Sequence, residues 1–278
     1  MIKRSQVEAD AKVARELLVE AVRPFADVPI LLSGGMDSAT LLFSLLELGR
    51  KPSVFTFRLE RHLSEDFTTA RDMAKTFDLP FYPIVIPESI EVLIADVRRI
   101  VSLLESSRKT WIQCAHPFLY IPAEVRSRGF DSVLWAGCLD YYFGASRKAQ
   151  VAYKTKGEES FLRARLAAID DPNSSDFALV KTAKSGGIDL IDVFLTDALR
   201  RFFFGLTFRE LHFEREKGFG LFIFPEYWKR GAWYRKKSNF QINSKIREYH
   251  DRLLRTEYNK RNARAVVAVY NDVKAGRI

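Results

Sequence analysis

The chain has 278 residues, 47% of them hydrophobic, which is enough apolar material for one large domain or for a core with a smaller second lobe. No apolar run approaches the length of a membrane span, and the charged residues 1–4 do not lead into the apolar core of a signal peptide, so we expect a cytoplasmic protein without membrane segments. The two cysteines, Cys114 and Cys138, form neither a Cys-x-x-Cys pair nor a cluster with histidines, which argues against a zinc site and predicts two reduced thiols.

The positive charge of the chain is concentrated in one segment. The formal net charge is +9, and residues 229–264 alone hold twelve Lys or Arg against three acids. Such a segment is either a solvated helical face or a surface for a polyanion, which includes nucleic acid, a triphosphate and a phosphorylated substrate. The sequence leaves both interpretations open.

A glycine-rich turn near the start of the chain is the strongest local signal. Residues 5–22 have the apolar spacing of an amphipathic helix, residues 28–32 are typical of a buried strand, and residues 39–46 are apolar enough for a helix. Between the last two lies Ser33-Gly34-Gly35-Met36-Asp37-Ser38. Two glycines let the backbone take positive φ and bring N–H groups close to an anion, and the next helix adds its positive end. The pattern therefore predicts a phosphate-binding turn without the lysine of a Walker A motif, the alternative being an ordinary glycine turn.

Strand and helix signals continue to alternate up to residue 136. Further strands are predicted over residues 53–57, 81–86 and 131–136, and helices over residues 64–77, 89–104 and 110–128. This alternation predicts an α/β fold with a doubly wound, mostly parallel sheet covered on both faces. In such folds ligands bind beyond the carboxyl ends of the strands, where Ser33 and Phe57 fall.

The second place where we expect chemistry is the loop over residues 137–144, because Asp140 follows a buried strand at the same edge as the glycine turn. After a loop at residues 170–175 the alternation is lost, and the remainder is predicted to be mainly helical, with the clearest helices at 199–211 and 242–262. We therefore expect an N-terminal helix with a nucleotide-binding α/β core over residues 1–150. A mainly helical C-terminal part over residues 151–278 would pack on this core.

The glycine turn resembles the Ser-Gly-Gly-x-Asp-Ser signature of the PP-loop ATP pyrophosphatases, which cleave ATP to AMP and pyrophosphate. Within this group, residues 26–245 are most similar to the synthetase domain of asparagine synthetases and β-lactam synthetases. Asp140-Tyr141-Tyr142-Phe143-Gly144 resembles the family segment Asp-Glu-x-Phe-Gly, and Lys237-Ser238-Asn239-Phe240 resembles Lys-x-x-Phe. A weaker similarity joins residues 189–196 to the family's Glu-Val-Arg-x-Pro-Phe-Leu-Asp. The resemblance implies an adenine nucleotide α-hydrolase-like fold and the cofactors ATP and Mg²⁺.

The same resemblance implies roles for individual residues. Asp37 and Asp140 would bind the Mg²⁺ ions, with Asp140 also counted as catalytic, and Lys237 would stabilise charge on the phosphoryl group and the tetrahedral intermediate. The nucleotide-binding set would consist of Ser33, Gly34, Gly35, Asp37, Ser38, Phe57 and Gly137. The structural alternatives are a turn-forming role for Asp140 and, for Lys237, one more cation in a basic run.

Departures from the family pattern concern the acceptor and the nitrogen donor. Residue 2 is Ile instead of the cysteine nucleophile of a glutaminase domain, so glutamine is not expected as the direct nitrogen source, and a separate glutaminase is a candidate partner. Residues 136–138 lack the glutamate of the family's Gly-Glu-Gly, and Tyr141 replaces an acid, which argues against asparagine as the product. A rebuilt acceptor site would have as candidate lining the aromatic residues Tyr141, Tyr142, Trp135 and Trp111, although such residues are more often part of the core.

These observations predict an ATP-dependent adenylating ligase that forms a C–N bond. A substrate carboxylate or carbonyl oxygen would attack the α-phosphate, and an amine or ammonia would then displace AMP. One alternative is a PP-loop enzyme that modifies a nucleobase in RNA, DNA or a nucleotide, favoured by the aromatic residues Trp228, Trp233 and Tyr234 among the cations of the basic segment. Another is a nucleotide-binding protein without turnover.

Overall fold

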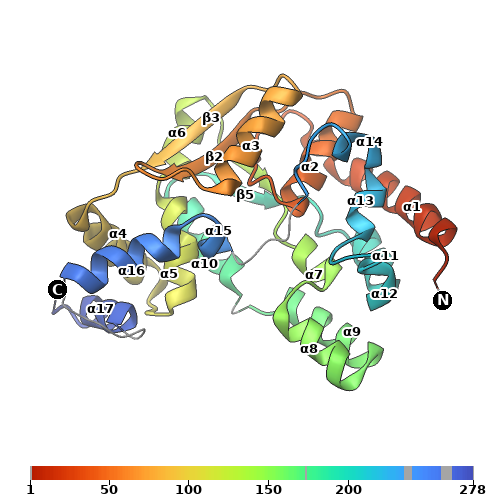
Figure 1. Cartoon of the computed structure of the whole chain (residues 1–278). Helices are drawn as coiled ribbons and strands as arrows, with labels where there is room; N and C mark the ends of the chain where they lie inside the picture. The colour runs from red at the N-terminus through yellow and green to blue at the C-terminus, as the bar shows by residue number, and fades with distance from the viewer. Residues whose placement is uncertain (1, 173, 235–239, 258–264, 278) are drawn as a thin grey trace.

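The computed structural model describes residues 2–172, 174–234, 240–257 and 265–277. At its centre lies a sheet of five strands in the order β3-β2-β1-β4-β5 (Figure 1). The strands are β1 Ile30–Leu31, β2 Val54–Leu59, β3 Phe81–Ile86, β4 Ser132–Trp135 and β5 Asp189–Asp192. All four pairings between neighbouring strands are parallel, which confirms the doubly wound α/β fold predicted from the sequence.

The strand order places a topological switch point at β1. Ile30 pairs with Val54 of β2 on one side and with Leu134 of β4 on the other. The chain moves outward from β1 to β3, returns to the centre and continues through β4 to β5. Connections from β1 and β4 therefore leave on opposite faces, and a crevice opens beyond the carboxyl ends of these two strands.

One face of the sheet is covered by helices from two separate parts of the chain. The first three are α1 Arg4–Val22, followed by the 3-10 turn η1 Arg23–Phe25, then α2 Met36–Glu47 and α3 Glu65–Thr76. Ser64 caps α3 by accepting the N–H of Phe67 at 3.2 Å. The segment after β5 supplies α11 Asp197–Gly205, α12 Phe208–Leu211, α13 Phe219–Ile223 and α14 Pro225–Trp228. Buried side chains of these helices and of β1 form one hydrophobic cluster.

The opposite face is covered by helices that connect the later strands. These are α5 Lys109–Ala115, the 3-10 turn η2 His116–Leu119, α6 Ile121–Ser127 and α10 Ser175–Ser185. Phe118, Val125 and Leu179 from these elements pack against Val133 of β4 and Leu190 of β5. Because both faces are covered, the strands read as apolar runs in the sequence.

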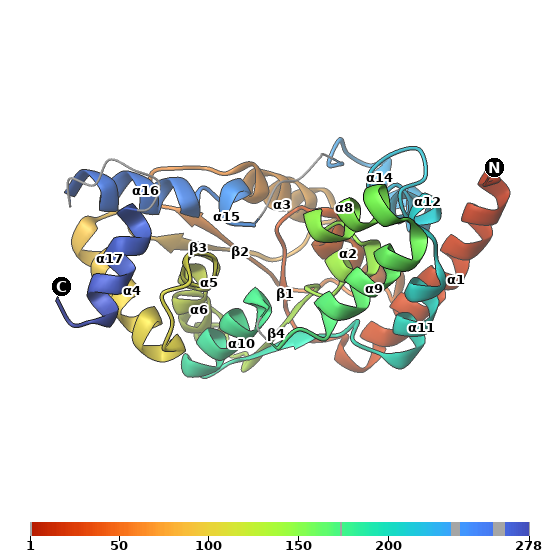
Figure 2. The same ribbon diagram turned by 90° about the horizontal axis from the view of Figure 1, so that it is seen from below.

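A third cluster of helices lies at one end of the molecule. It consists of α4 Ile90–Leu104, α15 Phe240–Asn243, α16 Ile246–Glu257 and α17 Ala265–Lys274. Figures 1 and 2 show α4, α16 and α17 at the end opposite to α1, α11 and α12, so that the two termini lie far apart. No helix within the described residues is long and apolar enough to cross a membrane.

Three further helices, which lie between β4 and β5 in the sequence, project from the carboxyl edge of the sheet. They are α7 Leu139–Phe143, α8 Arg147–Lys156 and α9 Glu158–Ile169 (Figure 1). Helix α9 packs against α7, α8 and α11, and thus joins the edge of the sheet to the helices that follow β5.

Several boundaries differ from those predicted. The helix expected over residues 110–128 is divided into α5, η2 and α6, because Pro117 and Pro122 lack the N–H that a continuous helix needs. The loop expected over residues 137–144 contains α7, and the first strand has two residues instead of five. Alternation also continues for one more unit, α10 and β5, since the acidic ends of Asp189–Asp192 conceal a short strand.

The last two predicted helices are also changed. The helix expected over residues 199–211 is split at Leu206, where Thr207 begins α12 with a capping box closed by Glu210. Of the helix expected over residues 242–262, α16 covers Ile246–Glu257, and residues 258–262 lie outside the described part.

Candidate active site

The glycine turn connects β1 to α2 and has one strained position. Gly34 has φ of +65°, and a Cβ at this residue would lie 2.6 Å from two side-chain atoms of Thr69 on α3. Gly35 instead has φ of −81° and ψ of 164°, which any residue can adopt. Gly34 is thus required by both conformation and space, whereas Gly35 serves as the N-cap of α2.

Two serines fix the shape of this turn. The Ser33 N–H donates to Ser38 Oγ at 3.1 Å, the two hydroxyl oxygens are also 3.1 Å apart, and Ser38 Oγ donates to the carbonyl of Gly35 at 3.2 Å. Because Gly35 has no side chain to accept the N–H groups of the first turn, the N-terminus of α2 retains donors for an anion. The turn therefore has the geometry of a phosphate site.

Asp37 of α2 and Asp140 of α7 converge on one cation, the ammonium group of Lys217. Lys217 Nζ lies 2.8 Å from both carboxylate oxygens of Asp37 and 2.5 Å from Oδ1 of Asp140. The two acids follow β1 and β4, the strands at the switch point of the sheet. Burial opposes the charge of Lys217, but Asp140 and Asp37 outweigh it and raise the pKa of this lysine.

Lys217 is held by a tight loop between α12 and α13. Its φ is +55°, and its N–H donates to Nδ1 of His212 at 3.0 Å. Burial, together with the charges of Lys217 and Arg165, lowers the pKa of His212 to about 4, so this ring is neutral and accepts that bond. A Cβ at Gly218 would lie 1.8 Å from the carbonyl of Phe213, so the loop also requires a glycine after Lys217.

Helix α7, which carries Asp140, is anchored at its start by Asp192 from the end of β5. Asp192 accepts the N–H of Cys138 at 2.7 Å, the N–H of Phe194 at 3.2 Å and the Cys138 thiol at 3.2 Å. Burial raises the pKa of Asp192 to about 6, although these three donors act against the increase. Burial and Asp192 also raise the pKa of the Cys138 thiol, so this residue is a small buried group with little thiolate character.

A cavity of about 650 Å³ lies at the carboxyl edge of the sheet and contains most of the predicted site residues. Its lining includes Ser33, Asp37, Ser38, Phe57, Gly137 and Asp140. Gly34 and Gly35 form the backbone of the adjacent turn. Lys237 lies outside the described residues, but Tyr234 and Phe240, on either side of its segment, both line the cavity.

The wall beyond the two aspartates is formed by aromatic and acidic side chains. Tyr141 Oη donates to Asp176 Oδ2 of α10 at 2.7 Å, and both residues line the cavity together with Trp135. Burial, followed by the charge of Asp140, raises the pKa of Asp176. Tyr142 is instead fully buried and donates to the carbonyl of Phe194 at 2.9 Å, while Trp111 packs against Phe177 away from this wall. Two of the four candidate aromatic residues therefore reach the cavity.

Sequence reasoning missed Lys217, Asp176 and Asp192. Lys217 stands in the run Glu214-Arg215-Glu216-Lys217-Gly218, where nothing but the glycine indicates a tight loop. Asp176 lies directly after the loop predicted over residues 170–175 and belongs to no predicted motif, and Asp192 belongs to the strand that was not predicted. All three act across long sequence separations, which local patterns do not reveal.

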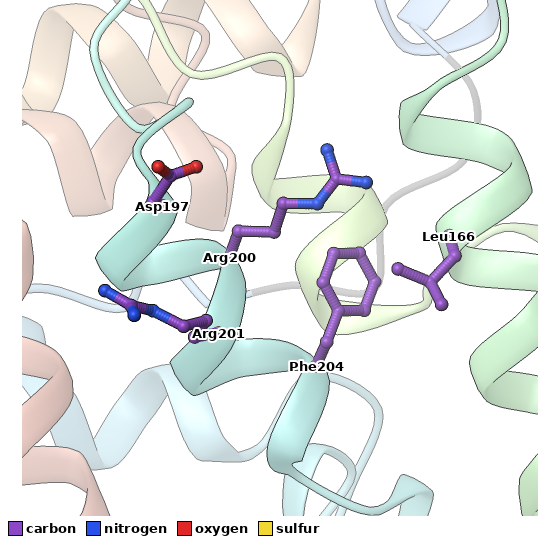
Figure 3. A pocket seen from close by; sticks show the side chains of 5 residues that line it. All are labelled: Leu166, Asp197, Arg200, Arg201 and Phe204. Atoms are coloured by element: carbon purple, nitrogen blue, oxygen red, sulfur yellow. The ribbon is translucent and has the colours of Figure 1, made fainter.

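A second hollow, of about 370 Å³, lies between α9 and α11. Figure 3 shows the guanidinium of Arg200, the ring of Phe204 and the side chain of Leu166 facing one another, with Arg201 pointing away. Arg200 already pairs with Asp170 through two bonds of 2.9 and 2.6 Å. The larger cavity is therefore the candidate active site.

The composition of the site limits the metal ions that it suits. Within the described residues, no group of three or more His, Cys, Asp or Glu side chains is arranged to hold a metal ion. Two carboxylates that converge on one cation are instead a donor set for Mg²⁺, which completes its coordination with phosphate oxygens and water.

Comparison with known families agrees with this geometry. Residues 13–189, more than half of the chain, match the asparagine synthase family, whose members are ATP-dependent synthetases. The chain belongs to the asparagine synthase family. The match covers the synthetase domain of this family, and no glutaminase domain is indicated. A comparison with curated proteins gives no significant match. Most of the lining of the cavity falls within the matched residues, and the segment that follows them supplies Glu216, Lys217, Tyr234, Phe240, Gln241 and Ser244.

Proposed function

We propose that this asparagine synthase family member is an ATP-dependent adenylating ligase that forms AMP and pyrophosphate and joins an amine or ammonia to an activated carboxylate or carbonyl carbon. The observation that carries the proposal is the convergence of Asp37 and Asp140 on one cation, next to the glycine turn. ATP carries several negative charges, and an oxygen nucleophile approaches the α-phosphorus only when they are neutralised.

The residues at the turn would bind the pyrophosphate part of ATP. Ser33, Gly34, Gly35 and Ser38 would surround it with hydroxyl and N–H donors, and Phe57 with Gly137 would contact the adenosine part. Asp37 and Asp140 would hold Mg²⁺, which when bound neutralises charge on the phosphates and orients them. Lys217 would exchange its bonds with the two carboxylates for bonds with phosphate oxygens, and Lys237 remains a predicted second cation for the transition state.

The acceptor would lie against the wall formed by Tyr141, Asp176 and Trp135. Tyr141 stands at the position of a family acid, and its hydroxyl donates to the carboxylate of Asp176. An acidic group would therefore be retained in the acceptor wall, but it comes from α10 and is hydrogen-bonded to the tyrosine that replaces the family acid. This rearrangement supports an acceptor other than aspartate.

The products of ATP turnover test this proposal. The protein should be incubated with ATP labelled at the α-phosphate, Mg²⁺, hydroxylamine as a general nucleophile and a panel of carboxylic acids. We expect labelled AMP, together with unlabelled pyrophosphate, in the presence of at least one acid. Asp37→Asn and Asp140→Asn should each lower the rate of this reaction at least a hundredfold, with unchanged melting temperature. Formation of ADP and orthophosphate would contradict the proposal. Full turnover in Asp140→Asn would show that Asp140 is not one of the site residues.

A nucleobase acceptor is the second candidate function. Tyr234 and Phe240, which belong to the basic segment 229–264, both line the cavity, so this segment contributes aromatic side chains to the site. Aromatic and basic residues together suit single-stranded nucleic acid. Pyrophosphate release that depends on an oligonucleotide, and not on any carboxylic acid, would favour this candidate.

A further inference from the structure

Arg165 of α9 is a charged side chain in the interior of the protein. It is 1% exposed, and its guanidinium lies between the rings of Phe161, at 5.0 Å, and Phe204, at 4.8 Å. Among the residues that the structure describes, no carboxylate forms an ion pair with it. Burial accordingly lowers its pKa to about 10, with Glu158 acting in the opposite direction, so Arg165 remains charged at neutral pH.

The charge is instead satisfied by four backbone carbonyls from two helix ends. The guanidinium donates to Tyr141 O at 3.2 Å and to Tyr142 O at 2.5 Å, both in α7, and to Phe203 O at 2.6 Å and Leu206 O at 3.2 Å at the end of α11. Carbonyls at helix C-termini lack partners within the helix and carry partial negative charge. The rigid fork of an arginine suits four acceptors at fixed positions better than a lysine does.

The neighbouring residues leave little room for another arrangement. Gly144 ends α7 with φ of +60°, and a Cβ there would lie 2.4 Å from Phe161 and 3.1 Å from Arg165. On the far side, Phe204 separates Arg165 from the hollow shown in Figure 3, where Arg200 links α11 to Asp170 at the end of α9. The guanidinium is thus closely packed between α7, α9 and α11.

Helix α7 has only five residues, so hydrogen bonds that hold its C-terminus also fix the orientation of its first turn. Asp140 immediately precedes Tyr141, and both Tyr141 and Tyr142 give their carbonyls to Arg165. Asp192 holds the start of the helix through the N–H of Cys138. With both ends fixed, the carboxylate of Asp140 is held where it meets Asp37 and the Lys217 ammonium.

We propose that Arg165 is a positioning residue for Asp140, which it fixes at the cation site by clamping the C-terminus of α7 to that of α11. A buried charge contributes little to stability compared with an apolar side chain of similar size, so a purely structural role does not require an arginine here. The proposal rests on the proposed function, because Asp140 is taken there as a ligand of Mg²⁺.

Manganese binding provides a test that does not depend on turnover. The probe is Mn²⁺ added to the protein saturated with α,β-methylene-ATP, which cannot be cleaved between the α and β phosphates, with affinity measured by electron paramagnetic resonance. Residues that orient metal ligands typically change metal affinity by 10- to 100-fold. We expect Arg165→Met to lower Mn²⁺ affinity by about 10-fold or more. Its affinity for the nucleotide analogue without metal should remain that of the wild type.

Three further variants make the test specific. Arg163→Met removes an exposed arginine from the same helix and should have no effect. Arg165→Lys should recover part of the lost affinity, and it replaces Arg165→Met as the test if the latter does not fold. If Arg165 acts through Asp140, the double variant Arg165→Met with Asp140→Asn should bind Mn²⁺ no more weakly than Asp140→Asn alone.

Three results would overturn the assignment. Additive losses in the double variant, or wild-type affinity in Arg165→Met while Asp140→Asn is impaired, would exclude Arg165 alone and leave the proposed function intact. Wild-type Mn²⁺ affinity in Asp140→Asn would exclude Asp140 as a metal ligand, and with it the role of Arg165, whereas the proposed function is contradicted separately by ADP and orthophosphate as products.

Discussion

Lys217 occupies the point at which Asp37 and Asp140 meet, and its position explains how the two carboxylates approach each other. An ammonium between them compensates the repulsion that two like charges at short distance would cause. The same ammonium competes with any metal ion for the same oxygens. Lys217 should therefore have opposite effects on metal binding without nucleotide and on turnover with it.

Replacing Lys217 with methionine should separate these two effects. Without nucleotide, Mn²⁺ should bind Lys217→Met about 10-fold more tightly than the wild type, because a competing charge is removed. With ATP, the rate of pyrophosphate release should fall about 100-fold or more, because a cation close to the phosphates is lost. Lys229→Met, which removes an exposed lysine of the basic segment, is the control and should change neither quantity beyond a small, salt-dependent effect. Unchanged Mn²⁺ binding in Lys217→Met would show that the ammonium does not occupy the metal position.

At the scale of elements, β5 and α7 are coupled through Asp192. This carboxyl lies at the end of the edge strand and accepts two hydrogen bonds from Cys138, two residues before Asp140, and a third from the N–H of Phe194. Its pKa of about 6 in the folded protein, against an ordinary value of 3.8, means that the folded protein binds a proton more readily than the unfolded chain does. Asp192 therefore contributes more to stability below about pH 4 than above pH 6, and its contribution is lost as the pH rises between these values.

Asp192→Asn should remove this dependence. The free energy of unfolding of the wild type, relative to that of Asp192→Asn, should fall by roughly 2–4 kcal/mol between pH 4 and pH 7, as a shift of about two pKa units requires. Urea denaturation at several pH values measures the difference. Asp189→Asn, at the exposed start of the same strand, is the matched control for the loss of one carboxylate from β5. A pH-independent difference for Asp192→Asn would show that Asp192 stays ionised in the fold.

Local patterns predicted most of the elements up to β4, although the helix expected over residues 110–128 is divided, and fewer of those that follow. Glycine conformation, helix caps and buried apolar runs act over a few residues, so the turn at Gly34, the helix that begins after Ser64 and the strand β3 were predicted with correct or nearly correct limits. The strand β5 was missed because its ends are acidic: Asp189 is exposed, and Asp192 anchors the start of α7. Likewise, Asp37 and Asp140 were predicted from motifs, whereas Lys217 and Arg165 are placed by packing across more than 20 residues of sequence.

At the scale of the whole molecule, the cluster of α4, α16 and α17 lies at the opposite end from the helices that hold Arg165 (Figure 2). Its interior contains a chain of polar side chains. His250 Nε2 lies 3.0 Å from His116 Nδ1 and its Nδ1 lies 2.6 Å from Tyr270 Oη, while His116 Nε2 lies 2.9 Å from Asp96. Both histidines are fully buried, so this network joins α17 and α16 to the α4–α5 region through groups that need defined protonation states.

Acid should therefore loosen the C-terminal helices before it affects the nucleotide site. Burial, followed by the charges of His116 and Lys109, lowers the pKa of His250 well below its ordinary value of 6.5. A histidine that is neutral in the folded protein contributes its full stabilisation above pH 6.5. As the pH falls, the unfolded chain gains the proton first, so the free energy of unfolding declines by up to about 1.4 kcal/mol per pH unit. Hydrogen exchange should show faster exchange of α16 and α17 at pH 5.5 than at pH 7.5, after correction for the intrinsic rate, with little change in α2. His250→Gln should abolish most of this difference. Tyr270→Phe is the control: it removes a hydrogen bond but no group that titrates at these pH values, so it should speed the exchange of both helices equally at pH 5.5 and pH 7.5. Equal acid sensitivity of α2 and α16 would show that the two ends unfold as one unit.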